Sequence, residues 1–289
     1  MAKQEVFSRD VVAENSDVHV DNFNAIADRK SIAYKFAVEK GPYDIVNLDL
    51  CTSFSGTQDE DSCYKAAWNL FEFQLNERTE PWVFLLTTRA DYKKVNPHDL
   101  PRYWQLVSDN AQKSTDFHEG LSSAYVDVSC DIIENPVAHL AKLRSPKFER
   151  LFGLCVGKWL LSLITTSRRW TMRLSDSYWY RTKSSSHPNM LSLAFLFESC
   201  PVELTDPAGL ASVRPTPVQA YDEVSQATDL LKKLIELTDL DVHLRDDPAA
   251  FEDAIAKSEA LLGSAGYPVN TYRDWVLSVL PALPRRGSA

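Results

Sequence analysis

The stretch 41–54, GPYDIVNLDLCTSF, constrains the fold of this chain most strongly. A Gly-Pro turn signal leads into a short apolar run, which ends on Asp49 and Cys51 before a polar loop. A run this short and this apolar is typical of a parallel strand that is buried on both faces. Ligands of open α/β sheets bind beyond the carboxyl ends of such strands, so Asp49 is a candidate site residue. The alternative interpretation is that Asp49 caps the following turn.

Length and charge limit the class of the protein. Its 289 residues suffice for one sizeable core with an appendage, or for two small domains. A formal net charge of −9 disfavours a nucleic-acid binder held by bulk electrostatics, although a local basic patch remains compatible with such binding. No apolar run reaches the roughly 20 residues that span a bilayer, and the start of the sequence lacks the apolar segment of a signal peptide. We therefore expect a cytoplasmic protein that does not bind membranes.

The metal-ligating and catalytic motifs of several large classes are absent. The five cysteines, at positions 51, 63, 130, 155 and 200, are scattered without a CxxC pair, which favours reduced thiols over disulfides or a zinc site. The six histidines are equally scattered, so we expect no structural metal. GxSxG and P-loop patterns are also absent, which disfavours esterases and nucleoside triphosphatases.

Strand and helix patterns alternate over the first 200 residues. After a short helix at 5–14, we predict three strands that are each followed by a helix. The strands lie at 17–20, 43–48 and 81–88, the last being a second strand expected to be buried on both faces. The helices lie at 25–40, 62–78 and 97–120. Then come a weak segment at 122–130, a helix started by Pro136, and a long apolar helix at 145–165. Gly153 and Gly157 of this helix are expected to let another element pack closely.

The period then becomes alternating, and the chain ends in helices. Residues 169–181 and 190–198 are predicted to form an antiparallel hairpin across the polar connection 182–189. Beyond it we predict three helices, at 218–237, 248–262 and 271–280, and a disordered tail from Pro281. The expected organisation is an α/β domain over residues 1–200, a proline-rich linker over 201–217, and a helical segment over 218–289.

This order of elements resembles the later part of a Rossmann-type S-adenosylmethionine-dependent methyltransferase. YDIVNLDL is similar to the fourth strand of that family, PWVFLLTT to its fifth, and the hairpin at 169–198 to the hairpin that ends its sheet after a long helix. HVDNFNAI resembles the third strand and the loop that touches the adenine. The resemblance implies an incomplete Rossmann-like, mostly parallel sheet with a C-terminal antiparallel hairpin, followed by a small helical appendage.

The resemblance also implies a site at the carboxyl ends of these strands. It places Asp21, Asn22 and Phe23 near the adenine of S-adenosylmethionine, and Asp49 where it holds or deprotonates the methyl acceptor. Asn47 shares a face with Asp49 and is a further candidate for contact with the cofactor, or else a structural hydrogen-bonding residue inside the sheet. Cys51 is a candidate nucleophile, although the Pro-Cys setting of cytosine-C5 enzymes is absent and a buried, inert thiol is the alternative.

The chain departs from the family at its front. The first strand of the family is followed by a Gly-rich turn that lets the backbone approach the cofactor, but none of the nine glycines here forms GxG. A sheet without the first two strands would leave unpaired backbone groups, each costing about 1–3 kcal/mol when buried. Three alternatives follow: the front of the protein is missing from this sequence, a protein partner supplies it, or the strands pair directly and the cofactor site is lost.

Basic and aromatic residues alternate around the hairpin. Such side chains stack on bases and hold phosphates, so nucleic acid is a candidate substrate. The alternative is a hairpin whose aromatic side chains face the core and whose cations are solvated. The basic residues are Arg168, Arg169, Arg173, Arg181 and Lys183, and the aromatic ones are Trp170, Tyr178, Trp179 and Tyr180.

Two functions are compatible with these patterns. The first is a methyltransferase-like subunit that acts on nucleic acid and is active only when a missing N-terminal segment or a partner completes it. The second is a non-enzymatic module with a degenerate methyltransferase fold, whose helices at 218–280 dock a partner.

Overall fold

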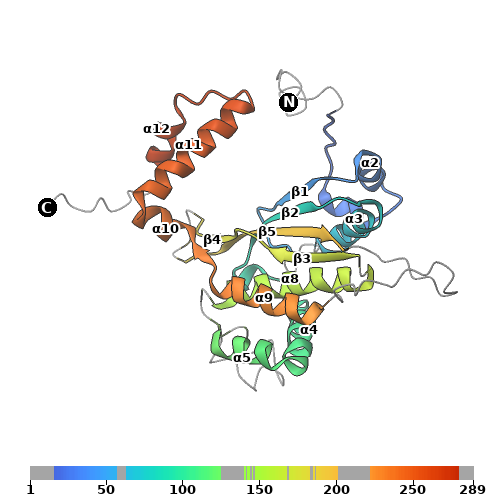
Figure 1. Ribbon diagram of the computed structural model, residues 1–289. Helices are drawn as coiled ribbons and strands as arrows, with labels where there is room; N and C mark the ends of the chain where they lie inside the picture. Colours follow the sequence, from blue (N-terminus) through green and yellow to red (C-terminus); the bar gives the residue numbers. More distant parts are fainter. Residues whose placement is uncertain are drawn as a thin grey trace, which may run out of the picture. The chain divides into compact units, whose positions relative to one another are not determined.

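The computed structural model describes residues 16–56, 63–124, 140–200 and 222–279, apart from positions 141, 144, 146, 168, 183, 184 and 186. These residues form a mixed α/β fold around an open, six-stranded sheet (Figure 1). The chain divides into two compact units, Asp21–Asp239 and Met1–Val20 together with Leu240–Ala289, which are described separately. The predicted helix at 5–14, positions 136–139 of the helix predicted to start at Pro136, the linker at 201–217 and the tail from Pro281 lie outside the described residues.

The sheet belongs to the unit Asp21–Asp239 and has the order β1-β2-β5-β4-β6, with β3 also paired to β5. Its strands are β1 (Ile45–Asp49), β2 (Trp82–Arg89), β3 (Trp170–Leu174), β4 (Tyr178–Tyr180), β5 (Met190–Ser199) and β6 (Thr238–Asp239). The β1–β2 and β4–β6 pairs are parallel, whereas β5 is antiparallel to β2, β3 and β4. Five strands of the described sheet therefore point one way and β5 points the other way, so the predicted α/β class with an antiparallel hairpin is confirmed.

The first strand of the hairpin is interrupted. The sequence pattern predicts one strand over 169–181, but the structure forms β3 and β4 with a break between them. At the break, the Ser175 N–H donates to the Ala194 carbonyl (2.7 Å), and the Ser177 hydroxyl oxygen accepts from the Ala194 N–H (3.1 Å). The hydroxyl takes the place of a backbone acceptor, which lets the strand bulge and continue.

Two predictions near the start of the described chain need correction. Residues 17–20 have no regular secondary structure, and Val20 is 84% exposed; a β-branched run forms a strand only where a neighbour takes up its backbone hydrogen bonds. The helix predicted at 25–40 is split into η1 (Phe23–Ala27) and α2 (Ile32–Lys40). Between them Asp28 accepts from the Lys30 N–H (2.9 Å), and Ser31 caps α2 by accepting from the Tyr34 N–H (3.0 Å).

One face of the sheet is buried under α3 (Tyr64–Glu77) and α8 (Lys147–Ser167). The side chains that β2 and β5 send to this face are at most 1% exposed at Trp82, Phe84, Phe195 and Phe197. Phe71 of α3 contacts this layer, with ring centroids 4.8 Å from Phe84 and 6.2 Å from Trp159 of α8. Fully buried aromatic side chains therefore form the contact between the sheet and its helices.

The opposite face of the sheet is only partly buried. Along β2, buried residues alternate with partly exposed ones, namely Val83, Leu85, Thr87 and Arg89. The prediction that both parallel strands are buried on both faces is therefore wrong, because α3 and α8 pack on a single face. We call this second, partly exposed face the open face.

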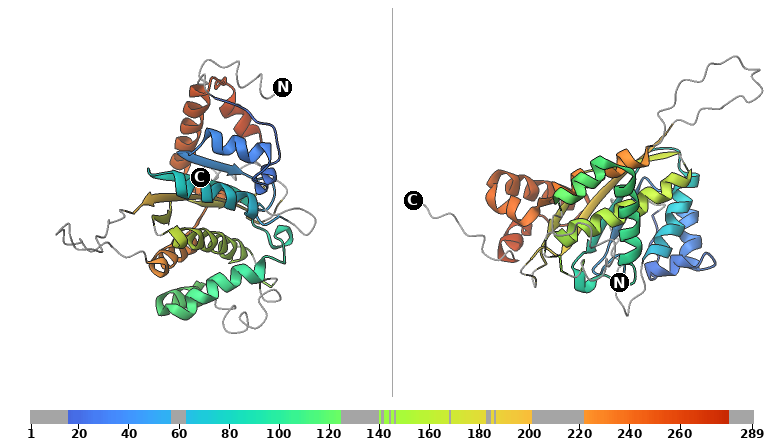
Figure 2. Two further views of the ribbon diagram at one scale, coloured as in Figure 1. Left: turned by 90° about the vertical axis from the view of Figure 1, so that its right-hand side faces the viewer. Right: turned by 90° about the horizontal axis from the view of Figure 1, so that it is seen from below.

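Further helices pack around α8: α4 (Leu100–Lys113), α5 (Thr115–Ala124) and α9 (Glu223–Ile235). Helix α9 also reaches the sheet, where Gln226 accepts from the Met172 N–H of β3 (2.8 Å). Figure 2 shows α4 and α5 on the side of α8 that faces away from the sheet. Gly153 and Gly157 face Leu234 and Leu230 of α9, which confirms that these glycines permit close packing. Buried Lys158 joins the three layers by donating to Asn110 of α4 (2.9 Å) and pairing with Glu223 of α9.

The other unit contains α10 (Leu240–Asp246), α11 (Pro248–Ser264) and α12 (Tyr272–Val279), close to the helices predicted at 248–262 and 271–280. Asp247 caps α11 by accepting from the N–H groups of Ala249 and Ala250, both at 3.0 Å. Arg273 of α12 pairs with Glu252 of α11 at 2.6 Å. Among the residues of these helices whose side chains the structure describes, Ile255 is the one buried hydrophobic residue.

Candidate functional site

Asp49 lies at the carboxyl end of β1, at the edge of the parallel β1–β2 pair. It stands opposite Thr87 of β2 in the register, and Asn47 stands opposite Leu85. Asp49 and Asn47 are both exposed and share the open face, because side chains two apart on a strand point the same way. The structure therefore brings these two predicted site residues together.

The register extends this position into a polar row across the open face. In the register, Asp49 is the partner of Thr87, Thr87 is the partner of Ser192 of β5, and Ser192 is the partner of Tyr178 of β4. With neighbouring strands about 4.8 Å apart, Asp49 and the ring-bearing Tyr178 are separated by roughly 14 Å across the sheet. Asp49 and Tyr178 thus lie on the same face of the sheet.

Arg89 ends β2 on the same face, and sequence reasoning missed it. In the register Arg89 is level with Met190 of β5, which is level with Tyr180 of β4. The Nε atom of Arg89 is buried and has no hydrogen-bond partner in the described part of the chain. A guanidinium N–H without a partner favours an anionic or carbonyl group nearby, so Arg89 adds a candidate anion contact to the carboxyl edge.

The loop after β1 is held by its own hydroxyl groups. Buried Ser55 accepts from the Asn96 N–H (3.0 Å) and lies 3.3 Å from the Ser53 hydroxyl, while Thr88 accepts from the Phe54 N–H (2.8 Å). These hydroxyls are structural, since they satisfy buried backbone groups. Cys51 in the same loop is exposed, so the interpretation of Cys51 as a buried thiol is wrong.

A buried carboxyl group lies at the start of α8. Glu149 is 3% exposed, and its Oε2 atom has no hydrogen-bond partner among the described residues. Burial raises the pKa of Glu149 and the negative charge of Asp91 adds to the rise, whereas hydrogen bonds to the backbone and to Ser145 and the charge of Arg150 lower it; the net result is a pKa of about 7. Glu149 therefore changes its charge near neutral pH, and no sequence pattern distinguishes it from a surface residue of a helix.

The residues expected to contact adenine make local turn contacts. Asp21 accepts from the Asn22 N–H (2.8 Å), and Asn22 caps η1 by accepting from the Asn24 N–H (2.9 Å). Phe23 is partly buried and packs against the core. These contacts account for the acidic and amide side chains of this loop as turn residues.

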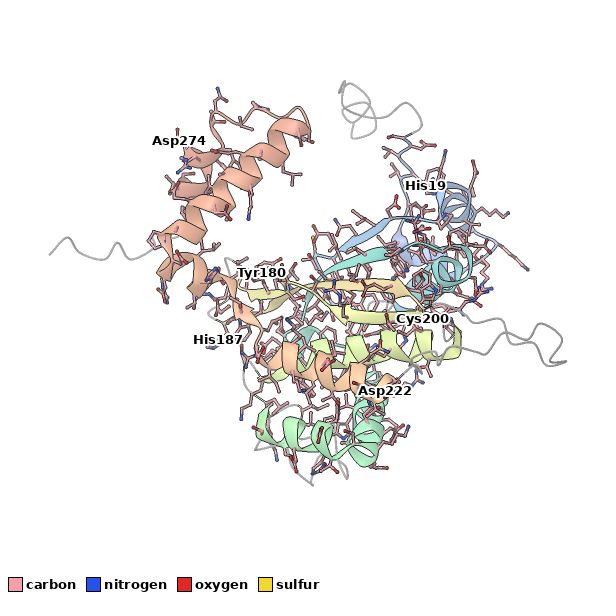
Figure 3. All side chains as sticks on the ribbon, in the orientation of Figure 1. His19, Tyr180, His187, Cys200, Asp222 and Asp274 are labelled. Atoms are coloured by element: carbon pink, nitrogen blue, oxygen red, sulfur yellow. The ribbon has the colours of Figure 1, made fainter. Side chains whose placement is uncertain are left out.

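The basic residues of the hairpin are spread along it. Arg169 lies beside Cys200, whose N–H donates to its carbonyl (2.7 Å), and Arg181 follows Tyr180; Figure 3 shows Tyr180 and Cys200 at opposite ends of the hairpin. The length of β5 puts these ends roughly 30 Å apart. Arg173, between them, is exposed and pairs with Glu198 (3.5 Å). Arg168 and Lys183 lie outside the described residues.

The aromatic residues of the hairpin divide between the two faces. Trp170 and Trp179 are buried on the helix side, where the Trp170 Nε1 group donates to the Leu75 carbonyl of α3 (3.0 Å). Tyr178 and Tyr180 are partly exposed on the open face. The alternative of core-facing aromatic side chains is therefore correct for the two tryptophans and wrong for the two tyrosines.

Among the described residues, no three His, Cys, Asp or Glu side chains are grouped so that they could hold a metal ion. Within the same ranges, no helix has both the length and the apolar character needed to cross a bilayer.

The comparisons with known proteins give one match. A family model described as PP_RS20740-like matches residues 1–277, which is nearly the whole chain. That description names neither an activity nor a ligand. No curated protein and no solved structure matches the chain.

Proposed function

The chain belongs to the PP_RS20740-like family, and we propose that it is a methyltransferase-like subunit that becomes active when a partner completes its sheet along β1. The observation that carries this proposal is the position of Asp49. It is exposed at the carboxyl end of a parallel edge strand, where open α/β sheets bind their ligands.

The connection of the elements supports the proposal. β1, α3 and β2 form a strand–helix–strand unit with parallel strands, and α8 follows β2 before the antiparallel hairpin. This is the order that resembles the later part of a Rossmann-type methyltransferase. Because the fold alone does not define an activity, the proposal depends on what the site residues do.

The described residues fit the acceptor better than the methyl donor. In the loop after β1, Gly56 has a φ of 70° and closes a turn through its N–H to the Ser53 carbonyl (2.9 Å), so it makes no Gly-rich turn. Asp21 and Asn22 are used in their own turn. The described residues by themselves therefore do not complete a pocket for S-adenosylmethionine.

The residues of the open face define what an acceptor would meet. Asp49 accepts a hydrogen bond from an amine or hydroxyl group, and the side-chain amide of Asn47 beside it can donate or accept a hydrogen bond. Arg89 contacts a phosphate or carboxylate, and Tyr178 stacks on a planar ring. These contacts favour a nucleotide as the acceptor, and the sulfonium methyl group would come from S-adenosylmethionine held with the partner's help.

The test uses the full chain copurified with its partners from cells that contain them. The complex is expected to transfer labelled methyl groups from S-adenosylmethionine to a nucleic-acid fraction, whereas the chain alone shows no micromolar binding of S-adenosylmethionine by calorimetry. Asp49→Ala should abolish transfer, and Asp116→Ala on the exposed surface of α5 is the matched control. Transfer retained by Asp49→Ala would remove Asp49 from the mechanism, and a complex that transfers nothing would refute the activity.

A second function is favoured by the free edge of β1. If the complex forms through this edge but transfers no methyl group, the chain is a non-enzymatic binding module. The two functions share the partner and differ only in the chemistry at Asp49, so the same preparation separates them.

A further inference from the structure

The outer edge of β1 offers a set of unpaired backbone groups. The Val83 N–H donates to the Asp44 carbonyl (3.0 Å), and the Leu50 N–H donates to the Thr87 carbonyl (2.8 Å). In a parallel pair, these two bonds fix which residues of β1 face β2, because bonding residues alternate along the strand. The N–H and C=O groups of Val46 and Leu48 therefore face β2, and those of Ile45, Asn47 and Asp49 face outward.

No described strand takes up these outward groups. In the described part of the chain β1 pairs with β2 and is the last strand of the sheet. Ile45 is 59% exposed, and Asn47 and Asp49 are exposed as well. Exposed edges are normally protected by short length, charged side chains, a proline or a bulge; the five residues of β1 contain no proline or lysine, and their one charged side chain is Asp49 at the carboxyl end.

We propose that the outer edge of β1 binds an extended segment of a partner protein in which apolar and basic residues alternate. This inference rests on the proposed function, which requires a partner, and it specifies the chemistry of that partner. An added strand satisfies the three outward N–H and C=O pairs, as in other cases of strand addition.

The side chains of β1 set the pattern of the added strand. On the helix side its residues pack beside Val46, which is partly buried, and Leu48, which is buried, so they are apolar. On the open face they stand beside Asn47 and Asp49, and a lysine or arginine there meets the carboxylate of Asp49. Alternation on a strand therefore requires apolar and basic residues in turn.

Charge also argues for another protein over a second copy of this chain. Two antiparallel copies of β1 centred on Asn47 would place Asp49 of each copy opposite Ile45 of the other, so neither carboxylate would meet a cation. Each copy also carries a formal net charge of −9, so the pairing would join two acidic surfaces. A basic strand removes this repulsion.

The experiment titrates the full chain with two end-blocked peptides of seven residues, one alternating valine with lysine and the other alternating valine with glutamate. The lysine peptide is expected to bind at least about tenfold more tightly, since like charges oppose the glutamate peptide. Hydrogen exchange read by NMR should show that the amides of Ile45, Asn47 and Asp49 exchange freely in the chain alone and slow down when the lysine peptide binds.

Two variants locate the binding on β1. Asn47→Pro removes one outward N–H and leaves the bonds to β2 intact, and should weaken the lysine peptide about tenfold. Asp49→Lys should weaken the lysine peptide and strengthen the glutamate peptide, which keeps the test valid if the proline disturbs the strand. Glu119→Lys on exposed α5 makes the same charge change elsewhere and should leave the preference for the lysine peptide intact.

Each other outcome overturns the inference. Amides of Ile45, Asn47 and Asp49 that are protected in the chain alone would show that the chain covers its own edge. A dimer that Asn47→Pro dissociates would show that a second copy of the chain occupies the edge. Equal binding of both peptides, or binding of neither, would refute the requirement for basic residues in the partner strand. Because S-adenosylmethionine is absent from these titrations, failure here is distinguishable from failure of methyl transfer.

Discussion

The two faces of the sheet contrast sharply, although they are built from the same strands. On the helix side, Trp82 and Phe84 of β2 stack against Phe197 and Phe195 of β5, with the first pair 4.1 Å apart. On the open face, the neighbouring positions carry Leu85, Thr87 and polar residues that remain partly exposed. The contrast teaches that buried packing is concentrated on one face of the sheet, whereas polar and partly exposed side chains lie on the other.

The largest effect on stability should come from creating a cavity on the helix side of the sheet. Phe84→Ala is expected to lower the free energy of unfolding by about 3–5 kcal/mol, because it removes a fully buried ring and leaves a cavity. Leu85→Ala, one residue along the same strand but on the open face, should cost less than half as much. Urea unfolding followed by circular dichroism measures both, and equal losses would contradict the division between the faces.

The buried carboxyl group of Glu149 makes the helix side sensitive to pH. Its pKa is raised to about 7 in the folded protein from 4.5, so the folded state binds more protons than the unfolded state between these values. The contribution of Glu149 to the free energy of unfolding is therefore fully present below pH 4.5. It falls by about 2–3 kcal/mol as the pH rises through 7.

The measurement for Glu149 is a series of urea titrations from pH 5 to pH 8. Glu149→Gln should remove most of the fall in stability over this range, because the amide stays neutral. Glu119→Gln, on the exposed surface of α5, should leave the fall unchanged. A wild-type profile as flat as that of Glu149→Gln would show that Glu149 is not protonated at neutral pH.

A substitution at the contact between α8 and α9 should change the stability less. A Cβ atom at Gly157 would lie 2.5 Å from Leu230 of α9, so Gly157→Ala forces this buried leucine to move. Overpacking costs about 1–3 kcal/mol, and the helix propensity of alanine returns roughly 1 kcal/mol, which leaves a small net loss. Gly120→Ala, whose Cβ would approach Leu231 to 3.2 Å, is the milder control in thermal unfolding. A gain in stability at Gly157 would mean that α9 is loosely packed.

The same contrast explains what the sequence could predict. The strands at β1, β2 and β5 and the long helix α8 follow from apolar runs and their period, and the glycines of α8 indicated a close neighbour. The sequence pattern wrongly predicted that β2 is buried on both faces, because Val83 and Leu85 are as apolar as residues of such a strand. It failed at 17–20 because a strand needs a partner that the local sequence does not specify.

The candidate site shows a similar division. Asp49 and Asn47 could be identified because an acidic residue directly follows an apolar run, which is a local signal. The row from Asp49 to Tyr178 depends on the register of four strands, and the environment of Glu149 depends on how α8 packs. Such positions join residues more than 100 apart in the chain, and no spacing rule reaches them.

The smallest effect on stability is expected at the open edge itself. Ile45→Thr should change the free energy of unfolding by no more than about 0.5 kcal/mol, because this side chain is 59% exposed and threonine keeps the β-branched shape of a strand residue. Leu48→Thr, on the helix side of the same strand, places a hydroxyl in a buried position and should cost clearly more. Urea unfolding of the chain alone gives both values. If Ile45→Thr proves as costly as Leu48→Thr, the outer part of β1 is already covered in the isolated chain, and the sheet has no free edge for a partner strand.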